Sequence, residues 1–260
     1  MSEQAVQAID GSEQAEAPKK TEGSSAKKAA GTRTVPKWET DARDRVRAAI
    51  RRYAKPLNDL VARDANEGDT RLLITDFLCA GLGYDKYDDL TTEYQVKGEF
   101  ADYGIRIDKQ LVAFIEVKRC SQKLNVKHLR QVQMYAVNEG VEWMILSNGQ
   151  VWQAYHMTAG LPVVIDLALE VDLLSDTASL AAKTDALFYL TKEAFKRRLI
   201  DDLWRARAAT SPKSLAQVLL SDVVADAIRK ELRRQTNHNA DVSEIHRILR
   251  GEVLRPETLL

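Results

Sequence analysis

The fold is decided by residues 101–118, which read ADYGIRIDKQLVAFIEVK. Residues 101–107 and 111–117 have the apolar, β-branched and aromatic content of strands, and Asp108–Lys109–Gln110 between them is typical of a hairpin loop. The first five residues of the second strand are apolar without interruption, as expected of a central strand that is buried on both faces. This stretch therefore predicts an antiparallel hairpin in the middle of a sheet.

The other expected elements follow from hydrophobic periodicity on both sides of the hairpin. Asn148–Gly149 is the strongest short hairpin signal in the chain, and Pro56 is expected to kink the first helix or to divide it in two. The pattern is mainly helical from Ser179 onward. The order predicts an α/β fold with a mixed central sheet flanked by helices and a helical C-terminal extension. In chain order, the expected elements are a helix from Trp38, a helix after residues 66–70, strands over 91–96, 101–107 and 111–117, a helix over 124–139, and strands over 141–147 and 150–156.

Composition divides the chain into three parts. Residues 1–37 contain no aromatic residue and few large apolar residues, so we expect a disordered tail. Residues 38–175 form the expected α/β domain, and residues 176–260 form a helical C-terminal region. Over the whole chain, 38 basic and 38 acidic residues give a formal net charge of zero. This balance argues against non-specific coating of nucleic acid, but not against a local basic site.

Several classes of protein are disfavoured by what the sequence lacks. No stretch approaches the roughly 18 apolar residues of a membrane span, and no apolar leader follows Met1, so we expect no membrane association. The two cysteines, Cys79 and Cys120, form no CxxC pair and no cluster with histidine, which disfavours zinc and disulfides and fits a reducing cytoplasm. No Walker A sequence is present, so we expect neither a nucleotide cofactor nor a motor.

Two carboxylates mark the hairpin as a candidate site. Asp102 lies near the start of its first strand and Glu116 near the end of its second, at similar distances from the loop, so the hairpin brings them roughly opposite each other. Such a pair, with the backbone carbonyl of Val117, makes an oxygen-only site for a hard cation such as Mg²⁺ or Mn²⁺. Lys118 shares the face of Glu116 and could orient or deprotonate a metal-bound water. The pattern predicts phosphodiester hydrolysis; the alternative is a salt-bridge ladder on an exposed sheet face.

The arrangement resembles the PD-(D/E)xK nuclease signature, with Ala101 in place of the proline before Asp102. More widely, residues 38–160 resemble the N-terminal nuclease domain of type I restriction enzyme R subunits, which implies a restriction-endonuclease-like core. Gln131 and Tyr135 match the QxxxY motif of RecB-like nucleases. The segments that carry the resemblance are Asn66–Glu67, Thr70–Arg71, Leu82–Asp85, Glu93–Tyr94, Ala101–Tyr103, Ile115–Lys118 and Gln131–Tyr135.

The resemblance implies a role for each matching residue. Lys118 would be the catalytic lysine, and Gln131 and Tyr135 would support the active site or touch the DNA backbone. Glu67 has an ordinary alternative as a first-turn carboxylate favoured by the helix dipole, and Gln131 and Tyr135 have one as a half-buried helix face. The implied catalytic residues are Asp102, Glu116, Lys118, Gln131 and Tyr135, and the implied metal ligands are Glu67, Asp102 and Glu116.

A basic strip follows the second strand of the hairpin. Residues 117–130 contain five basic residues and no acidic one. We expect Lys123, Lys127 and Arg130 to share a helical face and to contact nucleic-acid phosphates, which positions a strand without reading its sequence. The alternative is an ordinary solvated helix face.

The function that the sequence favours is Mg²⁺-dependent hydrolysis of DNA by a restriction or defence endonuclease domain without a motor. The alternative is a non-catalytic module of the same fold that binds protein or nucleic acid, with the C-terminal helices contacting a protein partner. A phosphodiesterase acting on RNA or nucleotides would use the same site.

Overall fold

The computed structural model describes residues 35–158, 160 and 163–258. Most of the expected disordered tail, residues 1–34, lies outside the described residues. Lys37, the last residue assigned to that tail, already belongs to the first helix. Within the described residues, no helix combines the length and the apolar composition that crossing a bilayer requires.

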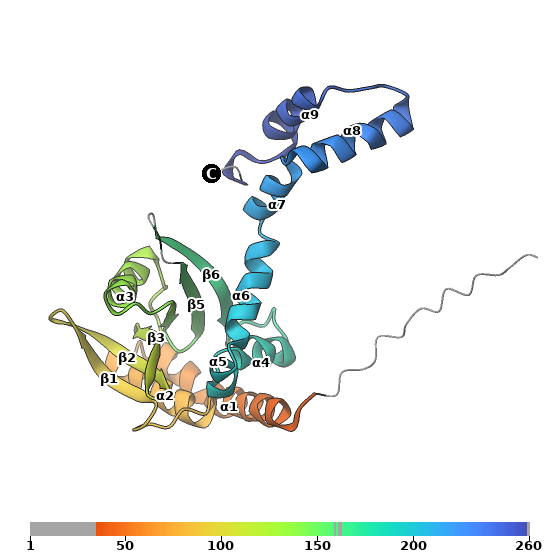
Figure 1. Ribbon diagram of the computed structural model, residues 1–260. Helices are drawn as coiled ribbons and strands as arrows, with labels where there is room; N and C mark the ends of the chain where they lie inside the picture. The colour runs from red at the N-terminus through yellow and green to blue at the C-terminus, as the bar shows by residue number, and fades with distance from the viewer. Residues whose placement is uncertain (1–34, 159, 161–162, 259–260) are drawn as a thin grey trace, which may run out of the picture. The chain divides into compact units, whose positions relative to one another are not determined.

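In the described residues, one sheet of six strands forms the centre of the fold, and its strands lie side by side in sequence order (Figure 1). The β3 and β4 strands are parallel, and all other neighbours are antiparallel, so the expected mixed sheet is confirmed. The sixth strand was not expected. The strands are β1 (Leu90–Val96), β2 (Glu99–Ile107), β3 (Gln110–Val117), β4 (Trp143–Ser147), β5 (Val151–Thr158) and β6 (Val164–Asp172).

Helices precede the sheet, connect its two parallel strands, and follow it to the C-terminus. The helix between β3 and β4 is the crossover that a parallel pair requires. A π-helical turn over Leu249–Val253 and a 3₁₀ turn over Pro256–Thr258 end the described chain. The helices are α1 (Lys37–Ala62), α2 (Glu67–Ala80), α3 (Val126–Glu139), α4 (Leu180–Phe188), α5 (Lys192–Lys196), α6 (Leu199–Ala209), α7 (Pro212–Leu219), α8 (Asp222–Thr236) and α9 (Val242–Ile248).

Two hydrophobic cores cover the sheet, and β3 contributes to both. Ile115 packs in the larger core, which side chains of α1, α2 and the helices after β6 share. Phe114, the preceding residue, packs in the smaller core, against Val132 and Tyr135 of α3. Because side chains alternate along a strand, β3 is buried on both faces, as its uninterrupted apolar run predicts.

The first helix is not divided. The α1 helix runs through Pro56, so of the two expected outcomes the division is wrong. Pro56 lies on the exposed face, where it lacks the N–H group of an ordinary helical residue and its ring crowds the carbonyl one turn earlier. Buried side chains on both sides of it, Tyr53 and Leu57, continue the same apolar face and hold the helix on the core.

Candidate active site

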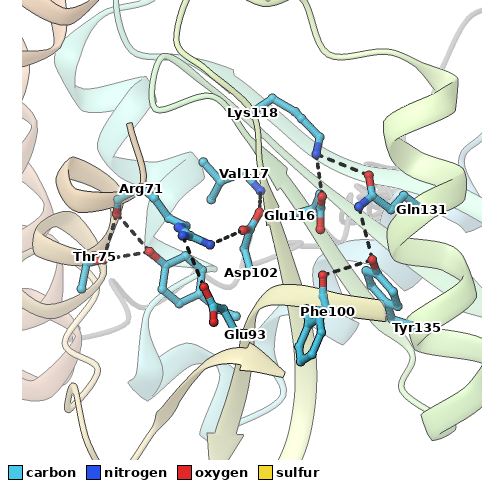
Figure 2. Close-up of polar contacts among 11 residues, drawn as sticks. Arg71, Thr75, Glu93, Phe100, Asp102, Glu116, Val117, Lys118, Gln131 and Tyr135 are labelled. Carbon is cyan, nitrogen blue, oxygen red and sulfur yellow. Dashed lines mark hydrogen bonds and ion pairs between the residues drawn. The ribbon is translucent and has the colours of Figure 1, made fainter. Parts of the chain in front are cut away.

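Asp102 is fixed at the end of the β2–β3 ladder. The pairing of these strands ends where Tyr103 lies opposite Ile115, and the next residues are Asp102 and Glu116. Beyond that pair, the backbone N–H of Val117 donates to Asp102 Oδ2 at 2.7 Å (Figure 2). The Asp102 carboxylate therefore takes the place of a strand partner for β3, at the position that a one-residue register shift between Ile105 and Arg106 gives it.

Glu116 is the most deeply buried carboxylate of the site, with only 3% of its side chain exposed. Its Oε1 atom accepts a hydrogen bond from Lys118 at 2.6 Å, whereas its Oε2 atom has no hydrogen-bond partner in the described part of the chain. Burial, together with the negative charge of Asp102, raises the pKa of Glu116 to about 7. A buried carboxylate oxygen without a partner is unfavourable unless a proton or a cation meets it.

Lys118 links the sheet to α3. Its Nζ atom donates to Glu116 Oε1 and, at 3.3 Å, to Gln131 Oε1. Burial lowers the pKa of Lys118, but the hydrogen bond and the charge of Glu116 outweigh it, and the net result is a raised pKa. The lysine is therefore protonated at neutral pH in this structure, and it acts as a hydrogen-bond donor.

Gln131 and Tyr135 extend this chain of hydrogen bonds along α3. They lie one helical turn apart, and Gln131 Nε2 donates to the Tyr135 hydroxyl at 3.2 Å. The same hydroxyl donates to the backbone carbonyl of Phe100 on β2 at 3.1 Å. The structure thus brings Gln131 to Lys118, and Tyr135 connects Gln131 to the strand that carries Asp102 (Figure 2).

Arg71 of α2 is a member of the site for which the sequence pattern predicts no role. Its guanidinium donates to Asp102 Oδ1 at 2.9 Å and lies 3.6 Å from a carboxylate oxygen of Glu93 on β1. Glu93 has a φ of 51°, which is uncommon for a residue other than glycine. The sequence signal for Arg71 is its place in Thr70–Arg71, one of the segments that carry the resemblance. Its contact with Asp102 leaves no local pattern, because the two residues are 31 positions apart in the chain.

Glu67 is not assembled with the other two acidic residues in this structure. It is the first residue of α2 and is exposed, and its charge contributes to the raised pKa of Glu116 only as a minor cause. In the described ranges, no group of three or more His, Cys, Asp or Glu side chains is arranged to hold a metal ion. The role of Glu67 as a ligand stays a prediction.

The residues that are assembled nevertheless fit a hard divalent cation. Glu116 offers a buried oxygen with no hydrogen-bond partner, and the neighbouring Asp102 offers a carboxylate close enough to raise its pKa. Both donors are oxygens, which Mg²⁺ and Mn²⁺ prefer. In this structure, the Arg71 guanidinium binds one oxygen of Asp102 and supplies a positive charge at the site.

The prediction that Lys123 shares a helical face with Lys127 and Arg130 is wrong. The side chain of Asn125 accepts hydrogen bonds from two N–H groups of the first turn, and α3 therefore begins only after Asn125. Lys123 lies in the loop before this cap and lines a different groove, beside Gln122. Lys127 and Arg130 do share an exposed part of α3. None of the three forms an ion pair within the described residues.

A comparison with protein families agrees with this geometry. Residues 66–162 match the family described as type I restriction enzyme R protein N terminus. The match begins at the cap of α2 and extends beyond β5, so it includes the carboxylates, the lysine and the QxxxY residues described above.

The expected resemblance to the N-terminal domain of type I restriction enzyme R subunits is therefore confirmed for this segment. It supports a role for the chain in a restriction system. No curated protein and no solved structure matches the chain.

Proposed function

We propose that this chain is a divalent-metal-dependent nuclease that hydrolyses phosphodiester bonds of DNA in a restriction or defence system. The observation that carries the proposal is the buried Glu116 Oε2 atom, which has no partner within the described residues and belongs to a carboxylate whose pKa the charge of Asp102 helps to raise. The similarity of residues 66–162 to restriction enzyme R proteins supports DNA as the substrate. Such a nuclease would act in the reducing cytoplasm, since Cys79 and Cys120 are both free thiols.

Each residue of the site has a distinct task under this proposal. Asp102 and Glu116 would hold Mg²⁺ or Mn²⁺, with Glu67 as the third acidic residue of the set. The bound cation supplies positive charge that stabilises the phosphate in the transition state and lowers the pKa of an attacking water. Lys118 would orient that water or take its proton, and the raised pKa that it has beside Glu116 favours the orienting role.

The residues of α3 position the lysine. Gln131 accepts a hydrogen bond from Lys118, and Tyr135 holds Gln131 in turn. We therefore expect Gln131→Ala and Tyr135→Phe to weaken cleavage without removing it, because the lysine keeps its hydrogen bond to Glu116 in both variants.

The test is cleavage of supercoiled, linear and single-stranded DNA by the purified chain with Mg²⁺ or Mn²⁺. Asp102→Ala, Glu116→Ala and Lys118→Ala should each abolish cleavage. Calorimetry should show that the two carboxylate variants lose Mn²⁺ binding, whereas Lys118→Ala keeps much of it because lysine is not a ligand. Lys86→Ala and Glu244→Ala, which remove exposed charges outside the site, should behave like the wild type.

Three results would contradict the proposal. Equal cleavage by the wild type and Lys118→Ala would indicate a contaminating nuclease. A wild-type chain that binds no Mn²⁺ and leaves every DNA intact would exclude the metal-dependent reaction. Cleavage of RNA or of free nucleotides, with DNA left intact, would assign the same site to a different phosphodiesterase.

One observation favours a second candidate, a non-catalytic module that assembles with another protein. The α7 and α8 helices carry large apolar side chains that remain exposed, among them Leu215, Val218 and Val223. Exposed apolar side chains that gather on successive helices are typical of a protein interface. A chain that cuts nothing and binds no metal, yet forms a specific protein complex that Val218→Asp abolishes, would support this candidate.

A further inference from the structure

A groove of about 580 Å³ lies beside the catalytic residues, between β2 and the exposed side of α3. Its lining includes Phe100 from β2 and Met134 from α3, whose residues are 54% and 50% exposed. A second hollow of about 500 Å³ shares Arg130 and Met134 with the first and continues along α3 to Val137, another exposed apolar residue. Together they form a continuous surface, which we call the α3 groove.

The charge of the α3 groove is positive. Lys127 and Arg130 line it, and neither forms an ion pair with any carboxylate of the described residues. Glu99 is the one acidic residue among the lining residues of the two hollows. Two unpaired cations therefore flank exposed apolar side chains, a combination suited to a ligand that is both anionic and flat-faced.

Hydrogen bonds connect the α3 groove to the catalytic residues. Gln131 and Tyr135 form part of its wall, and they reach Lys118 through the Gln131 side chain. Figure 2 shows Phe100, Tyr135, Gln131 and Lys118 following one another from β2 to the end of β3. A chain-like substrate whose reacting phosphate lies at Glu116 would have its neighbouring units along this groove.

We propose that the α3 groove binds an unpaired strand of DNA, so that the substrate of the site is single-stranded DNA or the frayed end of a duplex. This inference rests on the proposed function. The faces of unpaired bases pack on Phe100 and Met134, while Lys127 and Arg130 bind the phosphates. An intact duplex presents its phosphates to a protein surface but keeps its base faces stacked inside, so it would leave the apolar part of the groove uncovered.

The test is DNA binding without metal, so that nothing is cleaved. Fluorescence anisotropy in EDTA would compare a labelled oligothymidylate with a blunt duplex of the same length. Phe100→Ala should weaken single-strand binding about fivefold or more, since one stacked base contributes roughly 1–3 kcal/mol, and it should leave duplex binding unchanged. The variant keeps the backbone carbonyl that accepts from Tyr135, so the fold should be retained.

Two further variants make the test specific. Tyr87→Ala is the matched control, because Tyr87 is an aromatic residue that is 87% exposed and does not line the α3 groove; it should bind DNA as the wild type does. Arg130→Gln should reduce the slope of log affinity against log salt by about 0.7, the value expected for one lost phosphate contact on a single strand.

The outcomes separate the inference from the proposed function. Equal single-strand affinity for Phe100→Ala and the wild type, or tighter binding of duplex than of single strand, overturns the inference, even if cleavage depends on Lys118 as proposed. Single-strand binding that requires Phe100, in a protein that never cleaves, upholds the groove and contradicts the nuclease. If neither DNA binds, the groove belongs to another ligand such as a peptide, and the inference fails.

Discussion

Replacing Glu116 by glutamine should stabilise the metal-free protein above neutral pH. The buried carboxylate of Glu116 has one oxygen without a hydrogen-bond partner in the described residues, and burial together with the charge of Asp102 raises its pKa from 4.5 to about 7. Glutamine has nearly the same shape and keeps an oxygen that can accept from Lys118. It removes the charge, and with it the desolvation and repulsion that raise the pKa.

The magnitude follows from the pKa shift. A shift of roughly 2.5 units, at about 1.4 kcal/mol per unit, corresponds to about 3 kcal/mol. Because the folded protein binds the proton of Glu116 more tightly than the unfolded chain does, this contribution is fully present below about pH 4.5 and is lost as the pH rises through about 7. We therefore expect Glu116→Gln to match the wild type near the lower pH and to exceed it by up to about 3 kcal/mol near pH 8.

The assay is urea denaturation followed by circular dichroism, in EDTA, over this pH range. The free energy of unfolding of the wild type should fall with pH relative to that of Glu116→Gln. Glu244→Gln, which neutralises an exposed carboxylate on α9, should follow the wild type. Saturating Mn²⁺ should raise the free energy of unfolding of the wild type more than that of Glu116→Gln, because the cation binds the ionised carboxylate. Parallel pH profiles of the wild type and Glu116→Gln, or a loss of stability in the variant near pH 8, would refute the reasoning.

Two further predictions test neighbouring parts of the site. Arg71→Gln removes the guanidinium that binds Asp102 Oδ1, so Mn²⁺ no longer competes with a positive charge and its affinity, measured by calorimetry, should rise several-fold. Unchanged or weaker affinity would show that Arg71 does not compete with the metal. Asn125→Ala removes the side-chain cap of α3 and should lower the free energy of unfolding by about 1 kcal/mol, whereas Asn138→Ala, at an exposed position of the same helix, should cost less; equal effects of the two would contradict the cap.

The hairpin and its carboxylates could be predicted from sequence because both depend on local information. The apolar run of β3 identifies a central strand, and the two-residue turn at Asp108 and Lys109, both with positive φ, places Ile107 opposite Gln110. The turn register alone would place Asp102 opposite Ile115. A shift of one residue between Ile105 and Arg106 brings Tyr103 opposite Ile115, so that Asp102 and Glu116 follow at the same end of the ladder, and the sequence pattern gives no signal for this shift.

Features that depend on distant partners could not be predicted in this way. The ion pair of Arg71 with Asp102 joins two elements that nothing in the local pattern brings together. In β6, Asp166 and Glu170 interrupt the apolar pattern, and their side chains accept hydrogen bonds from Trp204 and Gln153 only once the fold exists.

The start of α3 illustrates a finer limit. Hydrophobic periodicity extends the helix to residue 124, but the side chain of Asn125 takes up N–H groups of the first turn, and this cap sets the boundary. A difference of a few residues is small for the fold. It matters for the site, because it moves Lys123 off the face that Lys127 and Arg130 share, and hence out of the α3 groove.

The energetics of Glu116 also bear on the choice between a nuclease and an assembly module. A protein that only binds a partner through its C-terminal helices gains nothing from a buried carboxylate whose raised pKa disfavours its ionised form above neutral pH. A nuclease needs that carboxylate in its ionised form, because only then does it bind a divalent cation. The ionised Glu116 carboxylate thus destabilises the metal-free protein and is required in the metal-bound one. If Mn²⁺ removes the pH-dependent loss of stability, the nuclease accounts for the buried charge; if Mn²⁺ has no effect, the assembly module becomes the better explanation of the chain.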